Sequence, residues 1–121
     1  MTPGEKQLLG QWGENRAAQY LETKGFRILM RNYRTPYGEV DLIVEKEGLT
    51  VFVEVKTRSG RDFGLPEEAV TPGKLQHLLK AIQVYWLEQE SEKPWQVDVI
   101  AVLRKPGEKD GEIEHFENVT T

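Results

Sequence analysis

The sequence predicts an α/β protein, a sandwich in which helices flank a central mixed β-sheet. Two segments, residues 4–24 and 72–90, repeat apolar residues at helical spacing, and each is introduced by the dipeptide Thr-Pro, a common start of a helix. Three segments rich in β-branched and aromatic residues lie between these helices, and a fourth follows the second helix. The expected order is therefore helix, three strands, helix and strand, with a last short strand at an edge.

The composition indicates one domain that spans residues 1–121. Cysteine is absent, which excludes a disulfide framework and a thiolate metal site. The N-terminus lacks the layout of a signal peptide and no apolar run approaches a membrane span, so we expect a cytoplasmic protein without a membrane partner. The net charge of −4 argues against a general nucleic-acid binder, yet residues 1–61 carry ten Lys and Arg against eight Asp and Glu.

The first helix carries a glutamate in an unusual place. Glu14 lies at the edge of the apolar stripe of the helix rather than opposite to it. Two interpretations stay open: a boundary glutamate paired with an arginine, or a residue of a functional site. The helix is expected to end at Lys24-Gly25, before a strand over residues 26–34.

The central hairpin predicts a cluster of charges on one face of the sheet. A turn at residues 47–48 sets its register, and continuing this register places Asp41 opposite Glu54 and Glu39 opposite Lys56. Side chains alternate between the faces of a strand, so these four charged residues are expected to share one face. The other face is apolar and is expected to be buried: Val40, Leu42, Val51, Val53 and Val55.

Two carboxylates that face each other across a strand pair repel each other. A divalent cation between Asp41 and Glu54 would turn this repulsion into ligation, with the carbonyl of Val55 as a further oxygen ligand. Lys56 would then stand beside the cation, where an ammonium steers water or holds a phosphate. A short Asp…Glu-x-Lys pattern also recurs by chance on solvent-facing strands, and the shared register favours the metal site over that alternative.

The second half of the chain supplies a polar loop, a helix and two strands. Residues 58–65 are either an ordinary connection or a flap that contacts a substrate backbone. The polar stripe of the second helix includes Lys74 and is either solvated or phosphate-facing. The strand over residues 95–103 is expected to return parallel to the hairpin, and its one charge, Asp98, lies near the site or in a structural ion pair. Residues 111–118 suit a charged edge strand.

A set of short motifs runs through most of the chain. They are Gly13-Glu14, Gly25-Phe26, Arg31-Asn32-Tyr33-Arg34, Gly38-Glu39-Val40-Asp41-Leu42-Ile43, Phe52-Val53-Glu54-Val55-Lys56-Thr57-Arg58, Phe63-Gly64, Ala69-Val70-Thr71-Pro72-Gly73-Lys74 and Asp98-Val99. In these motifs the sequence resembles the YraN-like uncharacterised protein family, numbered 0102, a branch of the PD-(D/E)xK nuclease superfamily related to archaeal Holliday-junction resolvases. The resemblance implies a restriction-endonuclease-like fold with the core order αβββαβ.

The resemblance also implies roles for the residues of the predicted site. Asp41 and Glu54 match the metal ligands, Lys56 matches the catalytic lysine, and Glu14 matches a first-helix glutamate that joins the site in the resolvase-like branch. The signature proline before the aspartate is replaced by Val40. The expected metal is magnesium or manganese.

Two functions follow from this set of residues. The first is a metal-dependent endonuclease that hydrolyses phosphodiester bonds of DNA, branched or damaged DNA included. The second is a module that binds nucleic acid or a protein partner on the same fold without cleaving it. The intact Asp, Glu and Lys set favours the enzyme, the acidic net charge favours the module, and the sequence leaves open whether a homodimer forms. Five basic side chains are expected to contact a nucleic-acid backbone: Arg31, Arg34, Arg58, Arg61 and Lys74.

Overall fold

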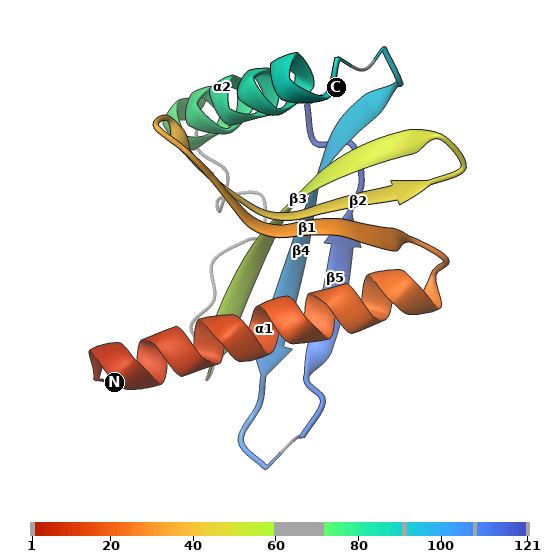
Figure 1. Cartoon of the computed structure of the whole chain (residues 1–121). Helices are drawn as coiled ribbons and strands as arrows, with labels where there is room; N and C mark the ends of the chain where they lie inside the picture. The colour runs from red at the N-terminus through yellow and green to blue at the C-terminus, as the bar shows by residue number, and fades with distance from the viewer. Residues whose placement is uncertain (1, 60–71, 91, 108, 121) are drawn as a thin grey trace.

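Two helices lie on opposite faces of one β-sheet in the computed structural model, which describes residues 2–59, 72–90, 92–107 and 109–120 (Figure 1). The elements are α1 (Pro3–Thr23), β1 (Arg27–Thr35), β2 (Gly38–Lys46), β3 (Leu49–Ser59), α2 (Pro72–Gln89), β4 (Trp95–Arg104) and β5 (Glu112–Phe116). Their order is the predicted one. Among the described helices, neither is long and apolar enough to cross a membrane.

The sheet is mixed and its strands lie in chain order, from β1 at one edge to β5 at the other. The pairs β1–β2, β2–β3 and β4–β5 are antiparallel, whereas β4 runs parallel to β3. The predicted parallel return of this strand is therefore confirmed, as is the edge strand after it. The fold is α/β and matches the restriction-endonuclease-like arrangement with its αβββαβ order.

The structure shows where α1 begins and where β3 ends, and the end of β3 differs from the predicted boundary. Thr2 caps α1, because its Oγ1 accepts a hydrogen bond from the backbone N–H of Glu5 at 3.2 Å. The second cap, at Thr71, lies outside the described residues. Strand β3 continues through Arg58 and Ser59, so the predicted loop begins two residues later than expected, and the rest of that segment also lies outside the described residues.

Both faces of the hairpin are buried, one under each helix. The predicted burial of a single face is wrong, because α2 covers the face opposite to α1 (Figure 1). The cluster under α1 contains Ala17, Ala18, Leu21, Leu42, Val44, Val51, Val53, Val55, Ile100 and Val102. The cluster under α2 contains Val40, Ile43, Phe52, Leu78, Ala81, Ile82, Tyr85 and Val97.

The hairpin register is confirmed over five residue pairs, from Lys46 with Leu49 to Leu42 with Val53. The described pairing ends there, one position before Asp41. The predicted pair of Glu39 with Lys56 is not formed, because the β2–β3 pairing stops at Leu42 and Val53, while on its other side Glu39 pairs with Arg34 of β1. Strands β2 and β3 thus part at the point where the charged residues begin.

The alternation of side chains also breaks at this point, in both β1 and β2. Leu42 packs under α1 but Val40 packs under α2, although an even spacing should place them on one face. On the neighbouring strand, Asn32 has a φ of +52°, in the left-handed region that asparagine tolerates better than most residues. Beside Asp41, the side chains of both strands therefore change the face of the sheet to which they point. Val40 was predicted to share a face with Leu42, but it lies on the α2 face instead.

Candidate functional site

The predicted metal ligands meet where β2 and β3 separate. Asp41 Oδ2 accepts a hydrogen bond from the backbone N–H of Val55 at 2.8 Å, so its side chain bridges to β3 after the described backbone pairing has ended. The Glu54 carboxyl, from the residue before Val55, is in direct contact with the Asp41 carboxyl. The structure thus brings together the two carboxylates that the sequence pairs. Ligation by the Val55 carbonyl remains a prediction.

These two carboxyls interact strongly because both are largely shielded from water. Burial, followed by the charge of Glu54, raises the pKa of Asp41 to about 7, and the Val55 N–H opposes this rise. Burial also raises the pKa of Glu54, and the ammonium groups of Lys56 and Lys74 oppose that rise. The pair therefore holds one charge more easily than two near neutral pH.

Glu14 lies in the same cluster and brings α1 into the site. Glu14, Glu39 and Asp41 each offer a carboxylate oxygen, and these oxygens lie within 4.8 Å of one another. Burial and then the Asp41 charge raise the pKa of Glu14, whereas the Arg31 guanidinium lowers it. Both interpretations of Glu14 thus have support: it borders an arginine, and it faces the predicted metal ligand.

Asn32 links two of these carboxylates. With its amide oriented so that the nitrogen faces them, it donates to Glu14 Oε2 at 3.1 Å and to Glu39 Oε1 at 2.7 Å. This places an uncharged donor between two groups that otherwise repel each other. The positive φ of Asn32 aims its side chain into the cluster, so the backbone conformation and the contact belong together.

Lys56 lies beside Glu54 and meets a second lysine. Contact with the Lys74 ammonium, and then burial, lowers the pKa of Lys56 to about 8, while the Glu54 carboxylate raises it. Lys74 is exposed in the first turn of α2, so the two helices contribute opposite charges to the site. The contact of Lys56 with Lys74 joins two residues that were expected to play separate roles, and contact of Lys74 with a nucleic-acid backbone stays a prediction.

The donor set fits a hard divalent cation. Asp41, Glu54, Glu14 and Glu39 offer only carboxylate oxygens, the ligands that magnesium and manganese prefer. Burial first, and then repulsion within this set, raises the pKa values of Asp41 and Glu14, and a bound cation would relieve the repulsion. The set includes no histidine or cysteine, which disfavours zinc at this site.

The predicted backbone-binding residues lie around this cluster but differ in their contacts. Arg31 donates to Asn15 Oδ1 at 2.7 Å, and Arg34 forms an exposed ion pair with Glu39 at 3.5 Å. Arg58 is exposed at the end of β3 and lies close enough to Lys56 to lower its pKa. Arg61 lies outside the described residues.

Sequence reasoning did not assign a site role to Asn32 or Glu39. Asn32 stands in the Arg31-Asn32-Tyr33-Arg34 motif. An asparagine between arginines of a predicted strand is the one feature that could have indicated its role in the site. Glu39 was placed on the polar face, but an exposed charge at the start of a strand gives no sign of its partners.

A close approach of α1 to β3 positions Glu14 over the site. At Gly13 an added Cβ would lie 2.8 Å from the Cβ of Thr57, closer than real side chains approach, so a residue with a side chain would push α1 away. Thr57 follows Lys56 directly, and Gly13 precedes Glu14. The glycine therefore sets the distance between the two halves of the site.

A sheet of this topology with Asp, Glu and Lys at the parting of two strands defines the PD-(D/E)xK nuclease-like class of proteins. Within that class the chain belongs to the uncharacterised protein family UPF0102, whose family model matches residues 13–102. The matched range includes Glu14, Asp41, Glu54 and Lys56.

Relatives of this family are similar over most of the chain. A UPF0102 protein of Syntrophomonas wolfei is 49% identical over 111 residues, covering 91% of this chain and 95% of the relative. A UPF0102 protein of Thermus thermophilus is 44% identical over 109 residues, covering 90% and 94%. A third, from Nocardia farcinica, is 47% identical over 109 residues, covering 88% and 84%.

Proposed function

We propose that this protein is a metal-dependent endonuclease that hydrolyses phosphodiester bonds of DNA. One observation carries the proposal: the half-buried Asp41 and Glu54 side chains touch each other, and Lys56 lies beside them. A chain that needed only a stable sheet would gain by replacing one of these carboxylates, because like charges held together destabilise the fold. Ligation of a cation would explain why both carboxylates are present, because the cation would offset their repulsion.

Magnesium or manganese fits this oxygen-rich set, and when bound it would supply charge neutralisation at a phosphate and a water of lowered pKa. Asp41 and Glu54 would hold the cation, with Glu14 from α1 and the Val55 carbonyl as further ligands. The Val55 N–H holds Asp41 Oδ2 and would thereby orient the Asp41 carboxylate for a cation. The protein thus orients a ligand through its own backbone.

Lys56 would act on the reacting groups. In the hydrolysis, the oxygen of a water bonds to phosphorus, the bond from phosphorus to the leaving ester oxygen breaks, and that oxygen takes up a proton. The Lys56 ammonium is placed to orient the water or to stabilise charge on a phosphate oxygen. Its pKa of about 8 keeps most of it protonated at neutral pH.

Arg31, Arg34, Arg58, Arg61 and Lys74 would contact the DNA backbone, a contact that does not depend on base sequence. Binding would require Arg34 to leave Glu39, which costs little because this ion pair is exposed.

A binding module without turnover is the second candidate function. The acidic net charge and the engagement of Arg31 and Arg34 within the chain favour it, since both reduce the positive surface available to a polyanion.

A cleavage assay separates the two functions. Linear, branched and single-stranded DNA are incubated with the protein and magnesium or manganese, and Lys56→Ala is compared with Lys109→Ala, which removes an exposed lysine on the β4–β5 connection. The enzyme requires cleavage that falls roughly a hundredfold or more in Lys56→Ala but not in Lys109→Ala. Binding without cleavage by the wild-type protein, with either metal, would instead establish the module.

A further inference from the structure

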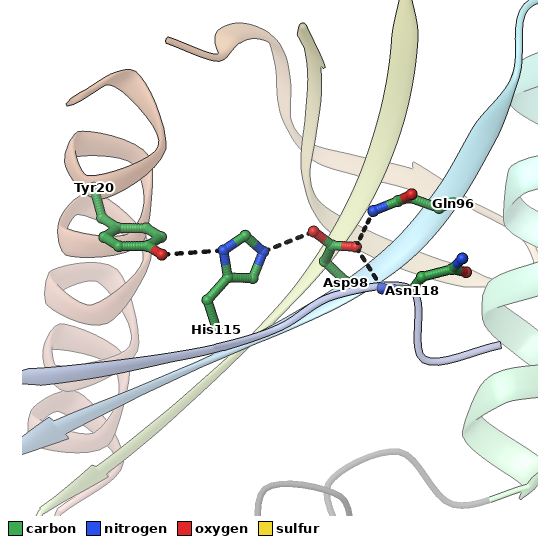
Figure 2. Close-up of polar contacts among 5 residues, drawn as sticks. All are labelled: Tyr20, Gln96, Asp98, His115 and Asn118. Carbon is green, nitrogen blue, oxygen red and sulfur yellow. Dashed lines mark hydrogen bonds and ion pairs between the residues drawn. The ribbon is translucent and has the colours of Figure 1, made fainter. Parts of the chain in front are cut away.

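A second polar cluster lies on the α1 face of the sheet. Asp98 of β4 is fully buried, and its Oδ2 is 2.7 Å from His115 Nε2 on β5 (Figure 2). The other ring nitrogen, His115 Nδ1, is 3.1 Å from the hydroxyl of Tyr20 on α1. His115 thus gives Asp98 a structural partner, and the chain of contacts ties α1, β4 and β5 together.

The cluster is separate from the candidate nuclease site. Asp98 pairs with Val53 on β3, and Val53 packs under α1. Glu54 is the next residue of β3, and the charge of Lys74 on α2 acts on it, so its side chain points away from that of Asp98. The two clusters share no residue, so a cation site at Asp98 does not depend on the proposed function.

Three side chains in this cluster offer the atoms that a transition metal binds. Asp98, His115 and Glu117 each provide one ligand atom, and these atoms lie within 4.8 Å of one another. One imidazole nitrogen with two carboxylate oxygens is a set that suits zinc and related divalent ions. The all-carboxylate set at Asp41 suits magnesium instead, so the two clusters differ in chemistry.

The partners of these ligands fit the same use. Gln96 Nε2 and the backbone N–H of Asn118 each donate to Asp98 Oδ1 at 2.9 Å, which leaves Asp98 Oδ2 facing His115 (Figure 2). Tyr20 holds the Nδ1 edge of the ring, so Nε2 points to the carboxylates. A metal-binding histidine commonly has its other nitrogen held in this way, and a metal-binding carboxylate is commonly hydrogen-bonded.

A cavity borders the cluster on the side of His115 and Glu117. His115, Glu117 and Tyr20 line a cavity of about 360 Å³, together with Lys24 and Lys46. The side chain of His115 is 10% exposed and that of Asp98 is 1% exposed, so an ion would reach the buried carboxylate past the imidazole. Water in the cavity can complete the coordination.

We propose that Asp98, His115 and Glu117 form a site for a zinc-class divalent cation. The metal takes the place of the proton between His115 Nε2 and Asp98 Oδ2. In a neutral ring that proton moves to Nδ1, and in a protonated ring it leaves to water, so that Nδ1–H donates to the Tyr20 hydroxyl in either case. Ligand atoms of a tetrahedral zinc stand roughly 3.3 Å apart, given bond lengths of about 2.0–2.1 Å. Opening the contact by about 0.6 Å would suffice, and His115 lies on the edge strand, where such a movement meets the least resistance.

The test uses the full chain with the other site disabled. Zinc is titrated calorimetrically into Asp41→Asn/Glu54→Gln, and cobalt is added separately so that its visible absorption reports the coordination. We expect one saturable zinc site, and we expect His115→Gln in this background to weaken it at least tenfold and abolish the cobalt spectrum. His77→Gln is the matched control, because His77 is the second of the two histidines and is exposed on α2.

Glu117→Gln keeps the proposal testable if His115→Gln folds poorly, since Glu117 is exposed. This variant should also weaken zinc binding, while its far-ultraviolet circular dichroism stays that of the parent. Equal zinc affinity in His115→Gln and His77→Gln would overturn the site, as would unchanged affinity in Glu117→Gln. The absence of saturable binding in the parent double variant would do the same.

Discussion

The burial of Asp41, together with the charge of Glu54, predicts that the metal-free protein loses stability as the pH rises. The pKa of Asp41 is about 7 in the folded state, against an ordinary value of 3.8. Between these values the folded protein holds a proton that the unfolded chain has lost. The free energy of unfolding therefore falls as the pH increases from about 4 to about 7. Glu54 contributes in the same direction, because its pKa is also raised.

The size of the loss follows from the shift. A rise from 3.8 to about 7 corresponds to about 4 kcal/mol, at about 1.4 kcal/mol for each pKa unit. This is an upper bound, because relaxation and water around the pair weaken the repulsion. We expect a loss of at least about 1 kcal/mol, or several degrees in Tm. Lys56 acts in the opposite sense at higher pH, since its pKa is lowered to about 8 and stability rises again above that value.

The assay is urea denaturation in EDTA at pH 5 and pH 7.5, followed by circular dichroism. Asp41→Asn should remove most of the difference between the two pH values, whereas Asp110→Asn, which changes an exposed aspartate, should leave it intact. Magnesium or manganese at ten times its Kd should add about 1.4 kcal/mol at pH 7.5 to the wild-type protein only. Identical pH dependence in the wild type and Asp41→Asn would refute the reasoning.

Three further variants probe the parts of the site. Gly13→Ala should lower the free energy of unfolding by about 1–3 kcal/mol through the clash with Thr57. Gly10→Ala is the control, because an added Cβ there meets nothing within 4 Å. Equal stabilities of the two variants in urea would contradict the close approach of α1 to β3. Asn32→Gly suits the positive φ but removes the shared donor, so the calorimetric affinity for manganese should fall roughly tenfold, and an unchanged affinity would argue against its role. Arg58→Ala should weaken DNA binding at all sequences alike and should reduce the slope of log affinity against log salt concentration by about one. Arg27→Ala, at the far end of β1, should leave this slope unchanged. An unchanged slope in Arg58→Ala would place Arg58 off the binding face.

The sequence predicted the order of elements and most of the hairpin because local signals decide both. A turn at residues 47–48 fixes the register, and β-branched residues on both arms extend it through Leu42 and Val53. Alternation then fails at Asp41, where the side chain accepts the Val55 N–H and the described pairing has ended. The replacement of backbone pairing by this side-chain hydrogen bond depends on where β1 and α1 lie, and no short segment of sequence encodes their positions.

Residues of the site were predictable to the extent that they share a local motif. Glu54 and Lys56 lie two residues apart on one strand, so their proximity follows from the strand itself. Lys74 contacts Lys56 from another element. It was expected to contact a phosphate backbone, but nothing in its polar stripe predicted its contact with Lys56. Asp98 of β4 and His115 of the edge strand β5 are 17 residues apart in the sequence. A single histidine in the last strand did not indicate that it would contact Asp98.

The two carboxylate clusters show how one sheet separates stability from a proposed function. Asp98 is fully buried, yet each of its oxygens has a partner, so the chain can satisfy a buried carboxylate with its own groups. Asp41 is less buried but touches a second carboxylate, and burial followed by the charge of Glu54 raises its pKa. A cation at either cluster would stabilise the fold in proportion to its occupancy, because it binds the folded state. Stabilisation by magnesium should therefore depend on Asp41, and stabilisation by zinc in the Asp41→Asn/Glu54→Gln variant should depend on His115.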